Sequence, residues 1–241
     1  MSEEILIRHR AIWRQKPVLH ALYTNWYGEM VSHLVPGMTL ELGGGTGNLK
    51  EFTPDVICTD IVKAPWLDAV ADGQALPFRN GSLANLVLFD VLHHIENVRL
   101  FFDEAVRVLR VGGRIVIMDP YISWCSWPVY RFLHPEPVDL SQDPMQVRPP
   151  DPDRLPFDAN QAVATILFER SFETFSRQFP GLVKRVHHRL AFFAYPLSGG
   201  FDHPSLLPMF AVRPLLTLER ALGFLDRVLA FRIFVVLEKR G

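Results

Sequence analysis

A glycine-rich turn that follows a short apolar segment restricts the folds open to this chain more than any other feature. Residues 38–49 read Met-Thr-Leu-Glu-Leu-Gly-Gly-Gly-Thr-Gly-Asn-Leu. Glycine carries no Cβ, so it lets a ligand approach the backbone closely and tolerates positive φ angles. An apolar strand, a glycine turn and a helix in this order predict an α/β domain with a ligand lying across the turn.

The spacing of the glycines separates the kinds of ligand. The dinucleotide pattern G-x-G-x-x-G that begins at Gly43 would need glycine at position 48, which is Asn48. A phosphate-binding P-loop would need lysine followed by serine or threonine after its last glycine, and Lys50 is misplaced for that role. The P-loop is therefore excluded, while a nicotinamide-dependent oxidoreductase is disfavoured but stays open.

Three further acidic residues follow apolar segments at distances typical of alternating strands and helices. Asp60 closes the segment 55–60, 17 residues after Gly43. Asp72 lies in the segment Ala-Val-Ala-Asp-Gly-Gln-Ala-Leu-Pro-Phe, and Asp90 closes the apolar run that begins at residue 86. In a doubly wound sheet ligands bind at the carboxyl ends of the strands, where such carboxylates would lie.

The pattern E-x-G-x-G-x-G of residues 41–47, followed by the segments 55–60, 69–78, 86–95 and 108–117, resembles class I S-adenosylmethionine-dependent methyltransferases. The likeness is to the small-molecule branch, similar to the quinone-ring methyltransferases, and covers roughly residues 38–119. It implies a Rossmann-like methyltransferase fold: a doubly wound, mostly parallel seven-stranded sheet flanked by helices, with N-terminal helices and a C-terminal helical insertion. In this family the last two strands are antiparallel.

The resemblance also implies roles for the positions that match the family motifs. Glu41 would face the positive charges of S-adenosyl-L-methionine, whose sulfonium gives up a methyl group and leaves S-adenosyl-L-homocysteine. Asp60 would bind the ribose hydroxyls, Asp72 the adenine amino group, and Asp90 would lie near the methionine or methyl end. The implied cofactor-binding residues are Glu41, Gly43, Gly44, Gly45, Gly47, Asp60, Ile61, Asp72, Gly73 and Asp90.

His93 and His94 are the candidates for a catalytic base, because an imidazole titrates near neutral pH and can take a proton from an acceptor. The same V-L-H-H-I segment occurs in relatives with different chemistries, so a role in shaping the loop stays open. Direct displacement also proceeds without a base when the acceptor is already nucleophilic. We expect no metal site, since no histidine and carboxylate spacing is typical of one.

The length of 241 residues suits one domain. We divide it into N-terminal helices (1–36), a cofactor-binding half (37–119), a proline- and aromatic-rich cover (120–160) and a C-terminal substrate-side half (161–241). Nine of the 19 prolines fall in residues 120–156, a density that disfavours helices and strands there. Further on, the predicted helices are 158–170, with a capping box at its start, and 171–179; the predicted last strands are 182–195 and 231–239.

Residues 205–231 form an apolar stretch for which we predict a strongly amphipathic helix, with Pro214 in its first turn. Arg213, Arg220 and Arg227 recur every seven residues and give a narrow charged stripe against a broad apolar surface. Such a helix packs in a core or a dimer interface, or it dips into a membrane surface or an oily substrate site. It is no membrane span, because charges interrupt it before the roughly 20 apolar residues that are needed.

The charge balance and the cysteines bear on partners and location. With 25 basic and 26 acidic residues the formal net charge is −1, so the chain lacks the basic excess of nucleic-acid-binding proteins. Two cysteines and an N-terminus unlike a secretory signal predict a reducing, cytoplasmic location. The expected partner is a small-molecule acceptor, with no nucleic acid and no membrane span, peripheral membrane contact left open and no oligomeric state assigned.

These patterns together predict an S-adenosylmethionine-dependent methyltransferase that acts on a small molecule. The surplus of Phe, Leu and Trp fits an apolar or lipid-linked acceptor and fits plain core packing equally well. Besides the nicotinamide-dependent oxidoreductase, a noncatalytic protein that binds the cofactor or a partner stays open as an alternative.

Overall fold

The computed structural model describes residues 2–241 and contains a seven-stranded sheet of order β3-β2-β1-β4-β5-β7-β6. The first five strands pair in parallel, while β7 runs antiparallel to both β5 and β6. The predicted doubly wound, mostly parallel sheet is therefore confirmed, including its antiparallel last strands. The strands are β1 Thr39–Leu42, β2 Ile57–Asp60, β3 Ala69–Val70, β4 Leu83–Phe89, β5 Leu109–Pro120, β6 Leu182–Leu190 and β7 Arg232–Lys239.

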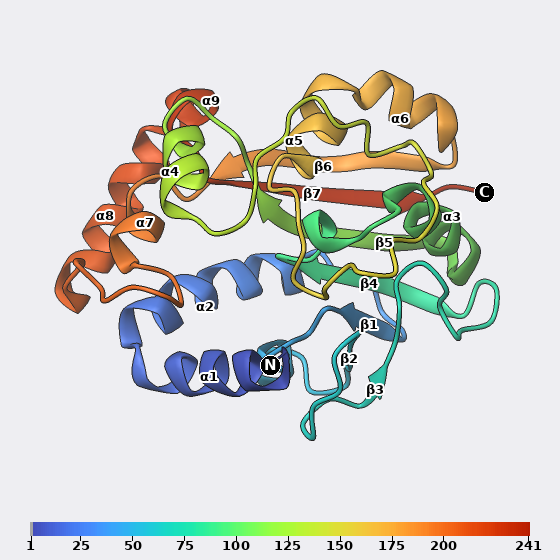
Figure 1. Cartoon of the computed structure of the whole chain (residues 1–241), viewed down its shortest axis with the longest axis horizontal. Helices are drawn as coiled ribbons and strands as arrows, with labels where there is room; N and C mark the ends of the chain where they lie inside the picture. Colours follow the sequence, from blue (N-terminus) through green and yellow to red (C-terminus); the bar gives the residue numbers. More distant parts are fainter. Residues whose placement is uncertain (1) are drawn as a thin grey trace.

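Helices cover both faces of the sheet and gather beyond one of its ends (Figure 1). The N-terminal pair α1 and α2 lies on one face, and α3 and α6 lie on the other. The helices are α1 Ser2–Gln15, α2 Pro17–Ser32, α3 Val98–Val108, α4 Ser126–Leu133, α5 Val163–Thr165 with a π-helical turn Ile166–Arg170, α6 Phe172–Gln178, α7 Ala194–Ser198, α8 Met209–Ala221 and α9 Asp226–Leu229, besides the 3₁₀ turns Asn48–Glu51, Leu92–His94 and Gly223–Leu225.

The central strand β4 shows why this sequence forms a doubly covered sheet. All seven of its residues are buried, as expected of a strand with helices on both faces. Side chains alternate between faces along a strand, so Leu86 and Leu88 pack in one core while Val87 and Phe89 pack in the other. The carboxyl ends of β4 and β5 point toward the group formed by α4, α7, α8 and α9 (Figure 1).

The proline-rich segment departs from the prediction that helices are not sustained there. Residues Ser126–Leu133 form α4, with Pro128 in its first turn. The first N–H groups of a helix have no partner within it, so a proline at this position breaks no hydrogen bond. The remainder, residues 134–162, has no helix or strand.

Two other predicted boundaries are wrong for local reasons. The predicted helix 158–170 begins only at Val163, because the side chains of its predicted capping box bond elsewhere: Asp158 accepts from the Leu155 N–H (2.8 Å), and the amide of Gln161 donates to Glu136. The predicted strand 182–195 ends at Leu190, where Ala191 takes a positive φ of 63° and turns the chain.

The predicted amphipathic helix of residues 205–231 is interrupted. Helix α8 ends at Ala221, a 3₁₀ turn follows, and α9 begins at Asp226. Pro214 lies inside α8, not in its first turn as predicted. A proline there leaves the carbonyl of Phe210 without its intrahelical donor. Phe210 is exposed, so this part of the helix is open to water.

We predict that Pro214→Ala stabilises the fold, because alanine restores the missing N–H in the middle of α8. The gain should be about 1 kcal/mol, since proline also restricts the unfolded chain, and the melting temperature should rise by about 2–4 °C. Thermal unfolding measures this. The matched control is Pro208→Ala at the N-cap of α8, which should give no increase; a lower melting temperature for Pro214→Ala would contradict the assignment.

Candidate functional site

The glycine loop adopts the backbone angles that its sequence predicted. Gly43, Gly45 and Gly47 have φ angles of 62°, 39° and 73°. A Cβ on Gly43 would lie 2.3 Å from a methyl of Val91, so the protein itself requires glycine there. A Cβ on Gly45 would lie 3.5 Å from Leu6, an ordinary van der Waals contact, so the φ of 39° is what favours glycine there. The loop thus combines one glycine that packing requires with others that the backbone conformation favours.

Glu41 lies behind the loop. Its side chain is buried, and Oε2 accepts a hydrogen bond from the thiol of Cys58 (2.7 Å). Burial raises the pKa of Glu41 to about 8, against the opposing effect of the Cys58 hydrogen bond. The carboxyl group abuts the loop from behind, since a Cβ on Gly44 would lie 2.8 Å from Oε2.

The carboxyl ends of β2 and β3 carry the next predicted residues. Asp60 is buried and accepts from the N–H groups of Gly45 (3.0 Å) and Val62 (2.8 Å), so it fixes the glycine loop to the end of β2. Burial raises the pKa of Asp60, and these backbone hydrogen bonds oppose the rise. Ile61 follows Asp60 in the chain, and its exposed side chain places an apolar surface beside the carboxylate.

Asp72 and Gly73 lie in the turn after β3. Asp72 accepts from the N–H of Gln74 (2.8 Å), and Gln74 in turn accepts from the N–H of Asn97 before α3 (2.9 Å). A Cβ on Gly73 would contact Phe101 at 3.4 Å, so a larger residue there would crowd the core under α3. The turn is thereby held against the sheet at the same edge as Asp60.

Asp90, at the end of β4, forms an ion pair with Arg232, which sequence reasoning missed. Asp90 has a positive φ of 57°, which is uncommon for a residue other than glycine. Arg232 is 1% exposed, and its guanidinium lies within 6 Å of four ring centroids, those of Tyr23, Trp26, Phe89 and Tyr195. The one available signal was an arginine at the start of an otherwise apolar strand, Phe231–Leu237.

The aromatic residues Tyr23, Trp26 and Tyr27 of α2 are buried. Tyr23 stacks on Phe89 with ring centroids 5.0 Å apart and accepts from Arg232 (3.3 Å). Trp26 and Tyr27 are buried in the same core. They support the end of β4, whereas α1 comes closest to the loop, through Leu6.

His93 lies in a buried cluster of charged groups beyond the ends of β4 and β5. Its Nδ1 is 2.9 Å from Oδ1 of Asp119, the last acid of β5, and its Nε2 is 3.4 Å from Oε2 of Glu136. Glu136 also accepts from the amide of Gln161, and Oε1 lies 3.8 Å from Nε2 of His94. The structure therefore places both predicted histidines beside two carboxylates that sequence reasoning did not single out.

Residues 40–117 match the family of methyltransferase domains. A crystal structure of an S-adenosylmethionine-dependent methyltransferase from Archaeoglobus fulgidus superposes with a TM-score of 0.54 at 10% identity, covering 91% of this chain and 94% of that one. Residues 40–117 are thus similar to methyltransferase domains, and the chain has the fold of class I S-adenosylmethionine-dependent methyltransferases. The cofactor that this family implies is S-adenosyl-L-methionine.

Two further comparisons set the extent of the likeness. A chain from the complex between the Haloferax volcanii Trm112 methyltransferase activator and a methyltransferase superposes on this chain with a TM-score of 0.52 at 12% identity, covering 99% of this chain and 95% of that one. An uncharacterised protein of Methanocaldococcus jannaschii is 30% identical over 114 residues, or 39% of this chain. The chain spans 56% of the length of that relative.

The two imidazoles of the histidine cluster differ in charge. Burial alone would lower the pKa of His93, but the attraction of Asp119 and Glu136 outweighs it and raises the pKa to about 10. Burial would raise the pKa of Glu136, but its hydrogen bond to His93 outweighs burial and lowers the pKa to about 2. His94 has its pKa lowered to about 4 by burial and by the charge on His93. At neutral pH the cluster thus holds a protonated His93 between two acids and a neutral His94.

Three ligand atoms in this cluster lie close enough to share a cation. One each from His93, His94 and Glu136 lie within 4.8 Å of one another. Hydrogen bonding of the far nitrogen of His93 to a carboxylate is also common for histidines that bind a metal. The expectation of no metal site was based on spacing along the chain, and these residues come together only through the fold.

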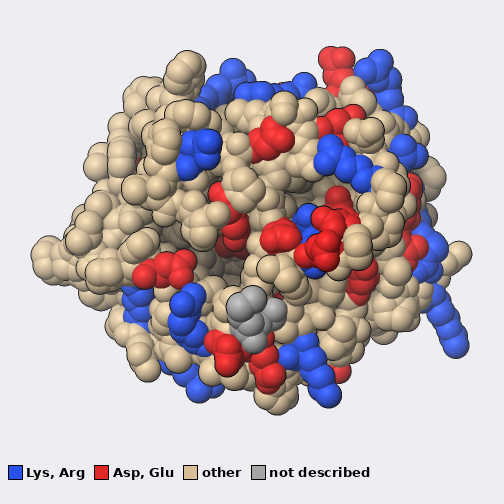
Figure 2. Space-filling view, viewed as in Figure 1, with Lys and Arg blue, Asp and Glu red and all other residues tan. Residues whose placement is uncertain are grey.

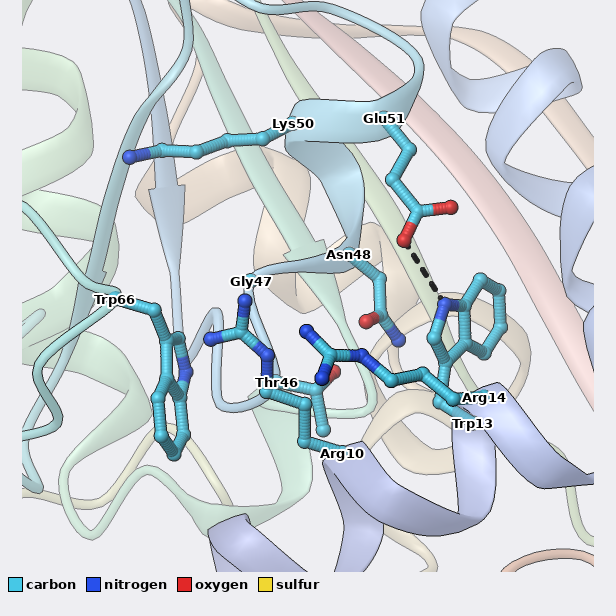
Figure 3. A pocket seen from close by; sticks show the side chains of 9 residues that line it. All are labelled: Arg10, Trp13, Arg14, Thr46, Gly47, Asn48, Lys50, Glu51 and Trp66. Atoms are coloured by element: carbon cyan, nitrogen blue, oxygen red, sulfur yellow. Dashed lines mark hydrogen bonds between the residues drawn. The ribbon is translucent and has the colours of Figure 1, made fainter.

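A cavity of about 220 Å³ adjoins the second half of the glycine loop (Figure 3). Among the predicted cofactor residues Gly47 lines it; the other walls come from α1, the 3₁₀ turn after the loop, and Trp66. The indole N–H of Trp66 donates to the Gly45 carbonyl (2.8 Å), and the guanidinium of Arg10 lies 4.4 Å from the Trp66 ring centroid. Helix α1 therefore closes one side of the loop through cationic side chains.

Acidic side chains surround a hollow in the middle of the face seen in Figure 2.

We predict that the His93 cluster makes the stability of the fold depend on pH in the alkaline range. A folded pKa of about 10 against the ordinary histidine value of 6.5 means that the contribution of His93 is complete below pH 6.5 and is lost as the pH rises through 10. The free energy of unfolding should therefore fall by up to about 1.4 kcal/mol per pH unit in this window. Chemical denaturation at several pH values measures it.

His93→Gln should remove this slope, because glutamine does not titrate. His203→Gln is the control, since His203 is exposed and should leave the slope in place. A slope that is the same in wild type and His93→Gln would show that His93 is not held as the protonated partner of Asp119 and Glu136.

Proposed function

We propose that this chain is an S-adenosylmethionine-dependent methyltransferase that transfers a methyl group to a small-molecule acceptor. The observation that carries the proposal is the meeting, at one edge of the sheet, of a glycine loop with positive φ angles, three strand-end acids and a buried histidine cluster. Their order along the edge matches the order of a ligand with a ribose, a methionine part and a reactive methyl group.

The residues present fit this cofactor. The cavity of about 220 Å³ at Gly47 lies against the glycine loop, and Asp60 offers carboxylate oxygens beside the exposed side chain of Ile61. Asp72 marks the neighbouring turn, where the adenine would lie. When bound, the cofactor supplies an electrophilic methyl group on sulfur. The roles of the predicted cofactor residues remain proposals that binding measurements test.

We propose His94 as the proton acceptor and His93 as a positioning residue. His94 is neutral, and its Nδ1 is buried without a hydrogen-bond partner. The carboxylate of Glu136 near Nε2 favours the tautomer with the proton on that nitrogen, which leaves the lone pair on Nδ1. His93, already protonated between Asp119 and Glu136, holds Glu136 in place.

The acceptor that we favour is apolar or lipid-linked. Tyr121, Tyr130 and Tyr195 lie around the end of β5 and the start of β7, so aromatic side chains flank the histidine cluster. No helix within residues 2–241 is long and apolar enough to cross a membrane. An acceptor of this kind would reach the protein from the surface of a bilayer. The cytoplasmic location is likewise proposed; Cys58 and Cys125 are both free thiols, as a reducing compartment favours.

Calorimetric titration of the purified chain with S-adenosylmethionine, S-adenosylhomocysteine and the nicotinamide dinucleotides tests the cofactor. We expect saturable binding of the two adenosyl compounds alone. Asp60→Asn should weaken it by about 1–3 kcal/mol, or about 5- to 150-fold, through the lost charge-assisted hydrogen bonds to the ribose. Asp55→Asn, at an exposed position, is the control.

Binding of a nicotinamide dinucleotide instead would support the oxidoreductase alternative. Binding of neither class would overturn the proposed function. Binding of S-adenosylmethionine without release of S-adenosylhomocysteine, across phenolic and lipid-linked acceptors, would support the noncatalytic alternative.

Turnover measurements should distinguish the roles of the two histidines. With an acceptor found by that screen, His94→Ala should lower kcat/KM by about 10²- to 10⁴-fold while the affinity for S-adenosylmethionine stays unchanged. The wild-type pH profile should be flat from about pH 6 to 8 and fall toward the His94 pKa of about 4, because the base must be neutral.

A rise of activity through pH 10 would instead identify His93 as the base. Loss of activity on dialysis against a chelator, restored by a divalent metal, would assign the cluster to a metal ion. Full activity of His94→Ala would contradict a base at this position.

A further inference from the structure

We infer that α4, α8 and α9 form a docking surface for an anionic lipid bilayer, here called the lipid-facing surface. This inference goes beyond methyl transfer, because it rests on the outer surface of these helices and holds whether or not the cofactor binds. The three helices adjoin one another at the end of the sheet where the acceptor would enter (Figure 1), and the N–H of Cys125 donates to the Val228 carbonyl (3.0 Å).

Large apolar side chains on this surface face outward. Trp124, Phe210 and Phe224 are 84%, 83% and 80% exposed. They are accompanied by Trp127, Phe132, Leu133, Leu206, Met209, Leu218 and Val228, all exposed. Scattered exposed apolar residues are ordinary, but a contiguous group of aromatic and leucine side chains marks an interaction site.

The inner sides of the same helices are satisfied within the fold, so the outward residues are not needed for it. On α4 the buried Tyr130 donates its hydroxyl to the Phe231 carbonyl (2.8 Å). On α8 the buried Glu219 accepts from the N–H groups of Phe193 (2.7 Å) and Ala194 (2.6 Å) at the start of α7. Each helix thus turns its polar anchors inward and its bulky apolar side chains outward.

The exposed charges on this surface have one sign. On α4 and in residues 205–231 they are Arg131, Arg213, Arg220 and Arg227. Among the described residues none of the four forms an ion pair. The two acids in the same segments are turned inward: Glu219 is buried, and Asp226 pairs with Arg189 (3.1 Å).

This combination fits an anionic bilayer better than a second protein. Tryptophan and other aromatic side chains partition into the membrane interface, and arginines beside them attract anionic headgroups. Two signals, apolar insertion and positive charge, together give stable peripheral binding where one alone is marginal. A second copy of the chain would bring the four unpaired arginines against four more, which opposes self-association through this surface.

Co-sedimentation of the full chain with vesicles tests the inference. We expect binding to vesicles of phosphatidylcholine with phosphatidylglycerol, weaker binding to phosphatidylcholine alone, and loss of the difference at high salt. Replacing Arg213, Arg220 and Arg227 by glutamine should weaken binding to anionic vesicles on the order of 100-fold. Lys63, Arg79 and Arg170, exposed on other elements, are replaced by glutamine in the matched control, which should bind as wild type does.

A second pair of variants tests the apolar part. Phe210→Glu combined with Phe224→Glu should abolish binding to both kinds of vesicle, whereas Val111→Glu, an exposed apolar position at the far end of β5, should not. Unchanged melting temperatures and S-adenosylmethionine affinities show that the variants fold, and keep this test separate from that of the proposed function.

Two results would overturn the inference. One is a wild-type chain that does not sediment with anionic vesicles at low salt, or sediments equally well when the surface arginines or phenylalanines are replaced. The other is a dimer, seen by light scattering, that the double phenylalanine variant disrupts, since the surface would then belong to a second copy.

Discussion

The buried ion pair between Asp90 and Arg232 joins the parts of the fold on which the site depends. Asp90 ends β4 on the cofactor side, and Arg232 begins β7, 142 residues later in the chain. A buried charge without its partner is strongly destabilising, so the pair holds the two ends in register. Four aromatic rings enclose the guanidinium of Arg232, which is 1% exposed, whereas the carboxylate of Asp90 is partly exposed. The end of β4, the aromatic core of α2 and the last hairpin are therefore fixed relative to one another before any ligand binds.

The same edge of the sheet carries a second charged cluster, in which the positive and negative charges do not cancel. His93 is held between Asp119 and Glu136, so one imidazolium faces two acids. That excess of negative charge attracts a cation such as a sulfonium and opposes an anionic acceptor. His94, kept neutral by burial and by the charge on His93, is the member that we propose takes a proton.

Local patterns in the sequence predicted the conformation of the glycine loop and the acids at the strand ends, but not the contacts of the histidine cluster. Gly43, Gly45 and Gly47 take positive φ angles, as a glycine turn after a strand predicts, and Asp60 and Asp72 lie at neighbouring strand ends. The partners of Asp90, His93 and His94 are Arg232, Asp119 and Glu136, which come from other strands and from a loop. Such pairs depend on tertiary contacts that no periodicity encodes. Helix α4 was missed because proline was taken as a breaker everywhere, although Pro128 lies in the first turn, where it breaks no hydrogen bond.

Helix α4 links the acceptor side of the site to the lipid-facing surface. Its inner side places Tyr130 against the start of β7, and the chain that leaves it reaches Glu136 within three residues of Leu133. Its outer side exposes Trp127, Phe132 and Leu133. A bilayer bound there would lie next to the loop that carries Glu136, so an apolar acceptor could pass from lipid to the histidine cluster without crossing water. Packing in the core explains the buried side of α8. It does not explain why the phenylalanines face outward or why the arginines are unpaired, whereas the lipid-facing surface gives both a role.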